Sequence, residues 1–261
     1  MRLSISNIAW EKEYDYEMYL YLKEIGITGL EVAPTRIFEN NPYDYLEEAT
    51  QFRKCVKENY NLNISSMQSI LYGKNENMFG TKSERTILIN YIKKAILFAE
   101  VLGCNNLVFG APKNRNMTTL NDYEISIPFF SELGDYAYKH NTILSIEANP
   151  AIYNTNFINT TMQAIQLVER VNSKGFKVNL DLGTIIQNNE NIDQLDFTYV
   201  NHVHISEPFL KEIEWSTIHN KLYEVLKKSN YKNYISIEMA KGTNLTEVKK
   251  TIFKFVNIFT Q

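Results

Sequence analysis

Polar and apolar residues alternate in four short stretches of the second half of the chain, and each stretch carries a side chain that can bind a metal ion. The stretches are Ile143 to Pro150 (ILSIEANP), Val178 to Gly183 (VNLDLG), Asn201 to Ser206 (NHVHIS) and Ile235 to Ala240 (ISIEMA). The metal-competent side chains are Glu147, Asp181, His204 and Glu238. Because side chains at i and i+2 of a strand share one face, the polar residues two positions earlier lie beside them: Ser145, Asn179, His202 and Ser236. The pattern predicts four strands that each have one polar face.

Similar strands are predicted along the whole chain, and helical stretches separate them. The predicted strands are Leu3 to Ser6, Gly29 to Ala33, Ile64 to Gln68, Asn106 to Phe109, Ile143 to Glu147, Lys177 to Asp181, His202 to Ser206 and Tyr234 to Met239. The predicted helices lie near Tyr14 to Ile25, Tyr43 to Asn59, Lys82 to Leu102, Asp122 to Lys139, Thr160 to Val171, Asn191 to Leu195 (a short one), Trp215 to Lys228 and Leu245 to Ile258. Helices that cover the apolar faces of parallel strands would leave the polar faces directed into a common interior.

The number of strand-and-helix units indicates the fold class. Eight such units within 261 residues match a TIM barrel. The main alternative, a doubly wound open sheet, usually has a Gly-rich turn after its first strand, but here that turn reads SNIAWEKEY and contains no glycine. No linker-like segment interrupts the units, so we expect an α/β protein with one (β/α)8 TIM barrel domain over residues 1–261. Because function in such barrels lies at the C-terminal ends of the strands, the four metal-competent side chains should share one rim.

Composition and charge narrow the classes of partner. The formal net charge is -3 and no block of Lys and Arg is present, which argues against nucleic acid and membrane surfaces and favours a small molecule. Two cysteines do not make a disulfide framework and fit a reducing compartment. The N-terminus alternates like a strand, and no stretch reaches the ~20 apolar residues of a membrane span. We expect a cytoplasmic protein.

Three carboxylates and one imidazole at a common rim predict a metal site. This mixture of oxygen and nitrogen donors suits one divalent ion, Mn²⁺, Mg²⁺ or Co²⁺ first of all, and Zn²⁺ as a further candidate. Such an ion can polarise a substrate carbonyl and stabilise the enediolate that forms when a proton leaves the neighbouring carbon. Two of the carboxylates could then act as general base and general acid on opposite faces of the substrate.

The chain resembles the xylose isomerase-like TIM-barrel superfamily, which includes sugar isomerases, ketose 3-epimerases, inosose dehydratases, hydroxypyruvate isomerases and endonuclease IV. The resemblance runs from SISNIAW near the N-terminus, through LEVAP, to SIEMAKG near the C-terminus. Its ketose 3-epimerase branch implies that Glu147, Asp181, His204 and Glu238 hold the metal. It also implies that Glu147 and Glu238 transfer the protons, so that the protein would be a metal-dependent isomerase or epimerase of a sugar, sugar phosphate or polyol. Members of this superfamily often form homodimers or homotetramers, and the same is expected here.

Two positions depart from the epimerase pattern. Thr184 stands where the branch has a substrate-contacting His three residues after the strand-six Asp, and Leu210 stands where it has an Arg six residues after the ligand His. Substrate recognition should therefore differ from that of a typical free-ketose 3-epimerase, and it should depend on the loops at Leu71 to Thr81 and Glu207 to Ile213. Two alternatives remain open, a dehydratase of a keto-polyol and a sugar-binding barrel without catalysis.

The endonuclease IV alternative is disfavoured by the histidine count. That group needs about nine ligands around three zinc ions, with additional His residues after strands three and four. The chain has four His in total, and it has Gln68 and Gly110 at those two places.

Six further residues are candidates for substrate binding. Glu31, which ends the second strand, could bind a substrate hydroxyl or cap a helix, and Trp10 could form an apolar wall. Gln68 could shape the pocket together with Tyr72 and Asn149, and His202 is expected to hydrogen-bond beneath the site and orient a ligand.

Two lysines complete the candidate set. Lys113 follows strand four and Lys241 follows strand eight, near where many barrels hold a phosphate. Each could bind an anionic sugar, and a solvated surface position is the alternative. The remaining histidines, His140 and His219, lie in helical stretches and are expected to face solvent.

Overall fold

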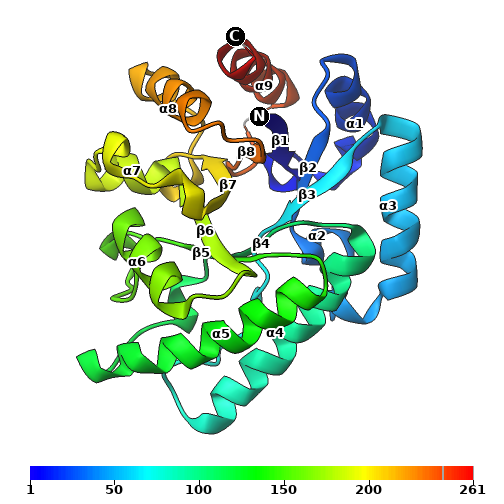
Figure 1. Cartoon of the computed structure of the whole chain (residues 1–261). Helices are drawn as coiled ribbons and strands as arrows, with labels where there is room; N and C mark the ends of the chain where they lie inside the picture. Colours follow the sequence, from blue (N-terminus) through cyan, green and yellow to red (C-terminus); the bar gives the residue numbers. More distant parts are fainter. Residues whose placement is uncertain (243, 261) are drawn as a thin grey trace.

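The computed structural model describes residues 1–242 and 244–260, and it confirms the single (β/α)8 barrel. Eight parallel strands close in sequence order: β1 (Arg2–Ser6), β2 (Gly29–Val32), β3 (Asn63–Met67), β4 (Leu107–Phe109), β5 (Leu144–Glu147), β6 (Phe176–Asp181), β7 (Val200–Ile205) and β8 (Tyr234–Ile237). The α-helices are α1 (Asp15–Glu24), α2 (Pro34–Ile37), α3 (Leu46–Tyr60), α4 (Lys82–Leu102), α5 (Tyr123–Lys139), α6 (Thr161–Val171), α7 (Leu182–Asn188), α8 (Thr217–Lys228) and α9 (Leu245–Phe259). They surround the strands (Figure 1).

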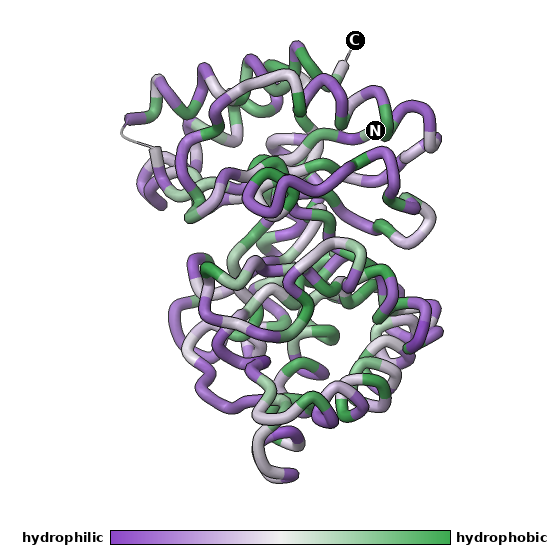
Figure 2. Tube along the Cα trace, turned by 90° about the vertical axis from the view of Figure 1, so that its left-hand side faces the viewer, coloured by the Kyte–Doolittle hydropathy of each residue, from purple (hydrophilic) through white to green (hydrophobic). Residues whose placement is uncertain are grey.

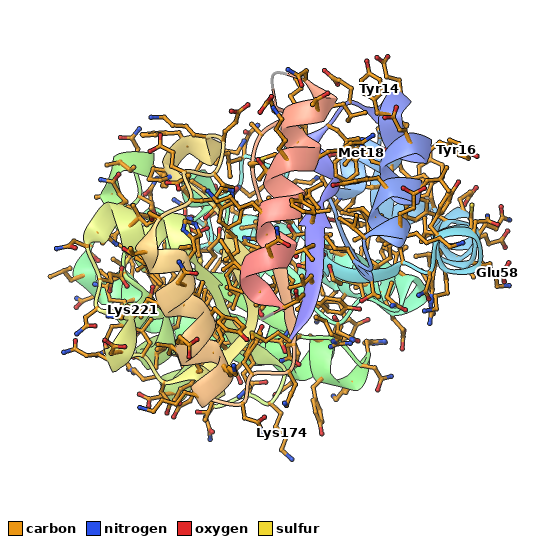
Figure 3. All side chains as sticks on the ribbon, turned by 90° about the horizontal axis from the view of Figure 1, so that it is seen from above. Tyr14, Tyr16, Met18, Glu58, Lys174 and Lys221 are labelled. Atoms are coloured by element: carbon orange, nitrogen blue, oxygen red, sulfur yellow. The ribbon has the colours of Figure 1, made fainter. Side chains whose placement is uncertain are left out.

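The two faces of each strand have different surroundings, as the alternation predicts. The outward residues Ile146, Leu180 and Val203 are fully buried in the hydrophobic core that lies between strands and helices. The helices are amphipathic, and hydrophilic and hydrophobic segments alternate along them (Figure 2). Charged residues on the outer faces, such as Glu58 and Lys221, extend away from the ribbon (Figure 3).

The barrel interior contains polar side chains that bond across neighbouring strands. The hydroxyl of Ser145 on β5 donates to Asn106 Oδ1 at 2.6 Å, and Asn106 Nδ2 donates to Ser66 Oγ on β3 at 3.0 Å. Buried polar groups need such partners. The register places Glu147 beside Asn179, Asp181 beside His204, and His204 beside Ser236.

One helix was missed from the sequence. We expected a short or poorly formed helix around Asn191 to Leu195, and a 3-10 helix, η7 (Ile192–Gln194), lies there, but the longer helix α7 begins directly after β6 and was not predicted. The reason is Asp181, whose Oδ1 accepts a hydrogen bond from the Thr184 N–H at 2.6 Å and so caps the helix. The short helix α2 was also not predicted.

The two helical histidines do not both face solvent. His219 is fully buried, and its ring lies 4.7 Å from the Trp215 ring at the start of α8, so the prediction for this residue is wrong. His140 is partly exposed and its Nδ1 lies 2.9 Å from Glu100 Oε2. Trp215 in turn stacks on Phe255 of the neighbouring helix α9, a contact that the sequence pattern of α8 does not reveal.

Both cysteines are free, and they occupy different environments. Cys55 is exposed on α3, whereas Cys104 is buried, and burial raises the pKa of its thiol to about 12. Within the described part of the chain, no helix has both the length and the apolar character that crossing a bilayer requires.

Candidate metal and active site

The structure brings the four predicted side chains together at the C-terminal end of the barrel. Glu147 ends β5, Asp181 ends β6, His204 lies on β7, and Glu238 directly follows β8. One candidate ligand atom from each lies within 4.8 Å of the others. His204 Nδ1 is 3.0 Å from Glu147 Oε1 and 3.2 Å from Glu238 Oε2. Opposite ligands of a six-coordinate ion with bonds of about 2.0–2.2 Å lie about twice that length apart, so the spacing fits one cation.

A second layer of buried groups fixes the orientation of these side chains. His204 Nε2 faces Glu31 Oε2 at 2.8 Å, which leaves Nδ1 directed at Glu147 and Glu238. Asn179 Nδ2 donates to Glu147 Oε1 at 2.7 Å. A carboxylate behind a ligand imidazole is the usual support of a metal-bound histidine. The donor set and its support therefore fit a divalent ion.

Asp181 is held by two donors from opposite directions. The hydroxyl of Ser206 donates to Oδ2, and the Thr184 N–H donates to Oδ1. The Thr184 hydroxyl donates to the carbonyl of Ala148 at 2.8 Å, and Thr184 is buried. The hydroxyl at this departure from the epimerase pattern therefore connects α7 to the segment after β5, and Thr184 is not among the residues that line the cavity.

The charges of the site shift several pKa values. Burial raises the pKa of Glu238 to about 7, and burial together with the charge of Glu147 raises that of Asp181 to about 6. Burial opposes the charged form of His204, but Glu238 and Glu31 outweigh it and hold the pKa of His204 well above its ordinary value. The same imidazole, with His202, holds the pKa of Glu31 below its ordinary value although burial acts in the other direction.

These pKa values predict that metal affinity depends on pH near neutrality. Glu238, Asp181 and the His204 imidazole must all lose a proton before they can bind a cation. We expect Mn²⁺ affinity to be greatest above about pH 7 and to fall as the pH is lowered through about 6. Calorimetric titration of the metal-free protein in two buffers of different ionisation enthalpy would show proton release on binding. An affinity that stays constant between about pH 6 and pH 8 would contradict this prediction.

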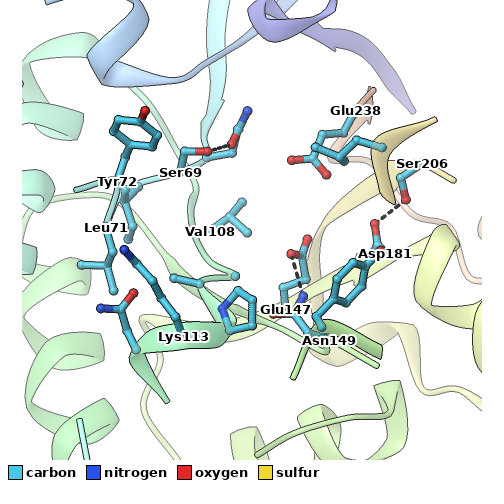
Figure 4. Close-up of a pocket in the computed structure, with 18 of the residues that line it drawn as sticks. Ser69, Leu71, Tyr72, Val108, Lys113, Glu147, Asn149, Asp181, Ser206 and Glu238 are labelled. Atoms are coloured by element: carbon cyan, nitrogen blue, oxygen red, sulfur yellow. Dashed lines mark hydrogen bonds between the residues drawn. The ribbon is translucent and has the colours of Figure 1, made fainter. Parts of the chain in front are cut away.

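The cavity above the four side chains has a volume of about 690 Å³. Glu147, Asp181 and Glu238 line it, and the carboxylates of Glu147 and Glu238 point into it (Figure 4). Both loops that were expected to govern substrate choice contribute, through Leu71 and Tyr72 on one side and Glu207, Phe209 and Leu210 on the other.

The substrate-binding candidates have different positions. Gln68 and Lys113 line the cavity, as do Tyr72 and Asn149. Gln68 Nε2 donates to Ser6 Oγ at 3.3 Å, and Lys113 Nζ lies 3.2 Å from Asn75 Oδ1.

Two candidates lie beneath the cavity. Glu31 is fully buried and contacts His204, and it is not among the residues that line the cavity. His202 is buried with its Nε2 2.9 Å from Ser236 Oγ and 3.4 Å from Glu31 Oε2, the hydrogen-bonding position that the sequence predicted.

Two candidates lie away from the cavity. Trp10 is buried against Tyr19 of α1 and donates from Nε1 to Asp15 Oδ1 at 2.8 Å, so it packs the core and forms no wall of the site. Lys241 is exposed and pairs with Glu11, in agreement with the solvated alternative. Alternation along strands does not determine the direction of residues in the turns that follow them.

The sequence reasoning missed Arg115, which is fully buried beside the end of β5. Its guanidinium donates to the Glu147 carbonyl at 2.8 Å and to Asn149 Oδ1. This contact directs Asn149 Nδ2 toward Glu147 Oε2, 3.4 Å away. Burial lowers the pKa of Arg115 to about 10, so it is charged at neutral pH. Arginine is usually exposed, and no local pattern signals this burial.

Gly110, at the end of β4, makes room for the Glu147 side chain. A Cβ at this position would clash with Glu147 Oε2. The absence of a side chain, which argued against a nuclease-type His at this place, also lets the carboxylate reach its position.

Replacing Arg115 with leucine should destabilise the end of β5. The change leaves the Glu147 carbonyl and the Asn149 amide buried without their donor, and we expect a loss of about 3 kcal/mol in the free energy of unfolding. Urea unfolding would measure it. Arg170→Leu is the control, because Arg170 forms an exposed pair with Glu124, and such pairs contribute about 1 kcal/mol or less. Equal stability losses in the two variants would contradict a structural role of Arg115.

Comparison with known proteins agrees with this architecture. Among solved structures, a 3-keto-D-glucoside 4-epimerase, YcjR, from E. coli is 17% identical over 98% of this chain and 99% of its own, with a TM-score of 0.79. A D-psicose 3-epimerase solved in the presence of D-fructose is 14% identical over the full length of both chains, with a TM-score of 0.81. An IolI protein with a bound zinc atom is 15% identical over 100% of this chain and 98% of its own, with a TM-score of 0.76.

Because these solved structures share less than a fifth of their residues with the chain, they establish only the fold. Membership in a family is established by a match to a family profile. None of the curated proteins matches the chain. The profile of a family described as xylose isomerase-like TIM barrel matches residues 20–254, which is most of the sequence. The chain therefore belongs to the xylose isomerase-like TIM barrel family.

Proposed function

We propose that this protein is a sugar isomerase or epimerase that depends on one divalent metal ion and works by proton transfer through an enediolate. The observation that carries the proposal is the pair Glu147 and Glu238. Both carboxylates point into one cavity from β5 and from the end of β8, and both contact His204. An acid and a base arranged in this way can act on the same substrate carbon.

In this proposal Glu147, Asp181, His204 through Nδ1, and Glu238 hold the ion. Mn²⁺, Mg²⁺ and Co²⁺ suit the three carboxylates best, and Zn²⁺ is compatible with the imidazole. When bound, the ion would supply Lewis acidity that polarises the substrate carbonyl. The solved IolI structure, which contains a bound zinc atom, supports the binding of a metal by a protein of this fold.

The chain itself performs the proton transfers. One glutamate removes the proton from the carbon beside the carbonyl, and the C–H electron pair becomes the double bond of the enediolate. The other glutamate returns a proton to the opposite face of that carbon, so the configuration is inverted. Asn179 and Asn149 hold the Glu147 carboxylate from two sides, at 2.7 and 3.4 Å, which orients it for this step. Solvent then resets the protonation of the pair.

Deuterium incorporation tests the proposal directly. The Mn²⁺-loaded protein is incubated with D-fructose, D-tagatose and D-psicose in D₂O, and the products are analysed by mass spectrometry. The expected product is an isomer that carries one deuterium at the inverted carbon. The solved D-psicose 3-epimerase structures, one in the presence of D-fructose and one with D-tagatose, motivate the choice of sugars.

The same assay separates the alternatives. Loss of water from the product would indicate a dehydratase of a keto-polyol, because an isomer keeps every atom of its substrate except the one hydrogen that is exchanged for deuterium. Binding of sugars without any deuterium incorporation would indicate a sugar-binding barrel.

A further inference from the structure

The site cavity extends well beyond the metal-competent side chains. Tyr72 and Leu71 lie on the side of the cavity opposite to Glu238 and Asp181 (Figure 4). Its volume of about 690 Å³ lies within the range of ~300–1,000 Å³ for pockets that enclose drug-sized ligands. A single keto sugar that reacts between Glu147 and Glu238 leaves the outer part of this space open.

Two large aromatic side chains flank the outer part. Tyr72 is 70% exposed and Phe209 is 59% exposed, although both line the cavity. They follow β3 and β7, and these strands are four places apart in a closed ring of eight, so the two rings approach the mouth from opposite sides. Aromatic faces at a cavity mouth are suited to bind the apolar faces of a flat ring.

The Phe209 side of the mouth is held in a strained backbone conformation. Among the described residues with positive φ that are neither Gly nor Asn, three of four line this cavity, namely Ser69, Phe209 and Leu210, and the fourth is Ile158. Such conformations cost about 1–3 kcal/mol each and concentrate at functional sites.

Specific contacts maintain this strained loop. The Phe209 N–H donates to the Tyr153 hydroxyl at 2.8 Å, and the rings of Tyr153 and Phe209 meet edge to face at 5.4 Å. The Ala240 N–H donates to the Leu210 carbonyl at 2.8 Å. The surroundings therefore fix an apolar wall at this place.

The charges of the lining exclude a phosphate as the group that fills the outer space. Four carboxylates line the cavity, those of Glu147, Asp181, Glu207 and Glu238. Of the described lining residues, Lys113 is the cation, and its ammonium already has Asn75 as a partner. A bound divalent ion still leaves the lining net negative, which disfavours an anion.

We propose that the substrate is a neutral keto sugar that carries a glycosyl substituent. The reacting keto unit lies at Glu147 and Glu238, and the second ring, that of the glycosyl substituent, lies between Tyr72 and Phe209, beside Leu210. This inference names the substrate class of the proposed function and rests on it.

The test compares sugars that share one reacting unit. Calorimetry with the Mn²⁺-loaded protein measures the affinity of D-fructose, of D-fructose 6-phosphate, and of isomaltulose, lactulose and turanose, which carry a neutral glycosyl group on fructose O6, O4 and O3. We expect at least one disaccharide to bind about tenfold more tightly than fructose, and the phosphate to bind more weakly than fructose.

Matched variants locate the second ring. Tyr72→Ala removes one aromatic face, and Phe209→Gly removes the other while suiting the positive φ of 64°. In each variant the affinity ratio of disaccharide to fructose should fall to about one. Tyr16→Ala is the control, because Tyr16 is 68% exposed on α1, away from the cavity, and it should keep the wild-type ratio.

Two outcomes would overturn the inference. The first is that fructose and all three disaccharides bind with equal affinity, and undetectable binding of every sugar counts as this result. The second is that D-fructose 6-phosphate binds most tightly of all. The proposed function is tested separately on the same preparation, by its metal content and by deuterium incorporation into free ketoses. The proposed function and the inference about the glycosyl substituent can therefore be contradicted independently of each other.

Discussion

Glutamine in place of Glu147 or Glu238 is expected to reduce formation of the inverted, deuterium-labelled sugar about 1,000-fold or more. An amide keeps the size of the side chain and one oxygen ligand, but it neither accepts nor delivers a proton at neutral pH. If the two residues act on opposite faces of one carbon, each single substitution stops inversion. Exchange is measured by mass spectrometry in D₂O with the metal-loaded variants.

The control for this experiment is Glu58→Gln. Glu58 is exposed on α3 and extends away from the barrel (Figure 3), so this variant should retain full exchange. Metal content is measured in all variants, because a loss of metal would reduce exchange for a different reason. Full activity in Glu147→Gln or Glu238→Gln would remove that residue from the acid and base pair.

Metal binding should be lost when a ligand other than the glutamates is removed. Wild-type protein should carry about one divalent ion per chain by elemental analysis, and His204→Ala and Asp181→Asn should carry about a tenth of that or less. Asparagine at position 181 is preferable to alanine, because its Oδ1 can still cap α7 through the Thr184 N–H. His204→Ala also leaves the buried Glu31 without its imidazole partner, so unfolding is measured alongside.

His140→Ala is the matched control for the histidine variant. His140 lies on the surface with Glu100, and its replacement should leave metal content unchanged. Wild-type protein that stays metal-free after supplementation with Mn²⁺ or Co²⁺ would contradict the site. Three zinc ions per chain would favour a nuclease instead.

The period of the strands explains why much of this architecture is predictable. Because side chains alternate with a period of two residues, Ile146 and Leu180 can be assigned to the core between strands and helices, and Ser145 and Asn179 to the barrel interior. This assignment does not require knowing which residues they contact. The closed barrel then requires strand ends such as Glu147 to meet. These inferences depend on spacing within a single strand.

The residues that were placed wrongly depend on contacts between distant parts of the chain. Glu31 and His204 are separated by 173 positions, and the sequence does not show that one lies behind the other. Arg115 is buried because the loop after β4 folds under the end of β5. Trp10 lies in a turn, where no period relates one residue to the next.

Asp181 is both a candidate metal ligand and the N-cap of α7, and this limits how the site can be redesigned. One of its oxygens caps α7 and the other accepts from Ser206, so an imidazole at position 181 would change the metal preference and unwind the first turn of the helix together. Glu238 follows β8 and caps no helix. An engineer who wants a softer, histidine-rich centre should therefore begin at position 238 and leave position 181 as it is.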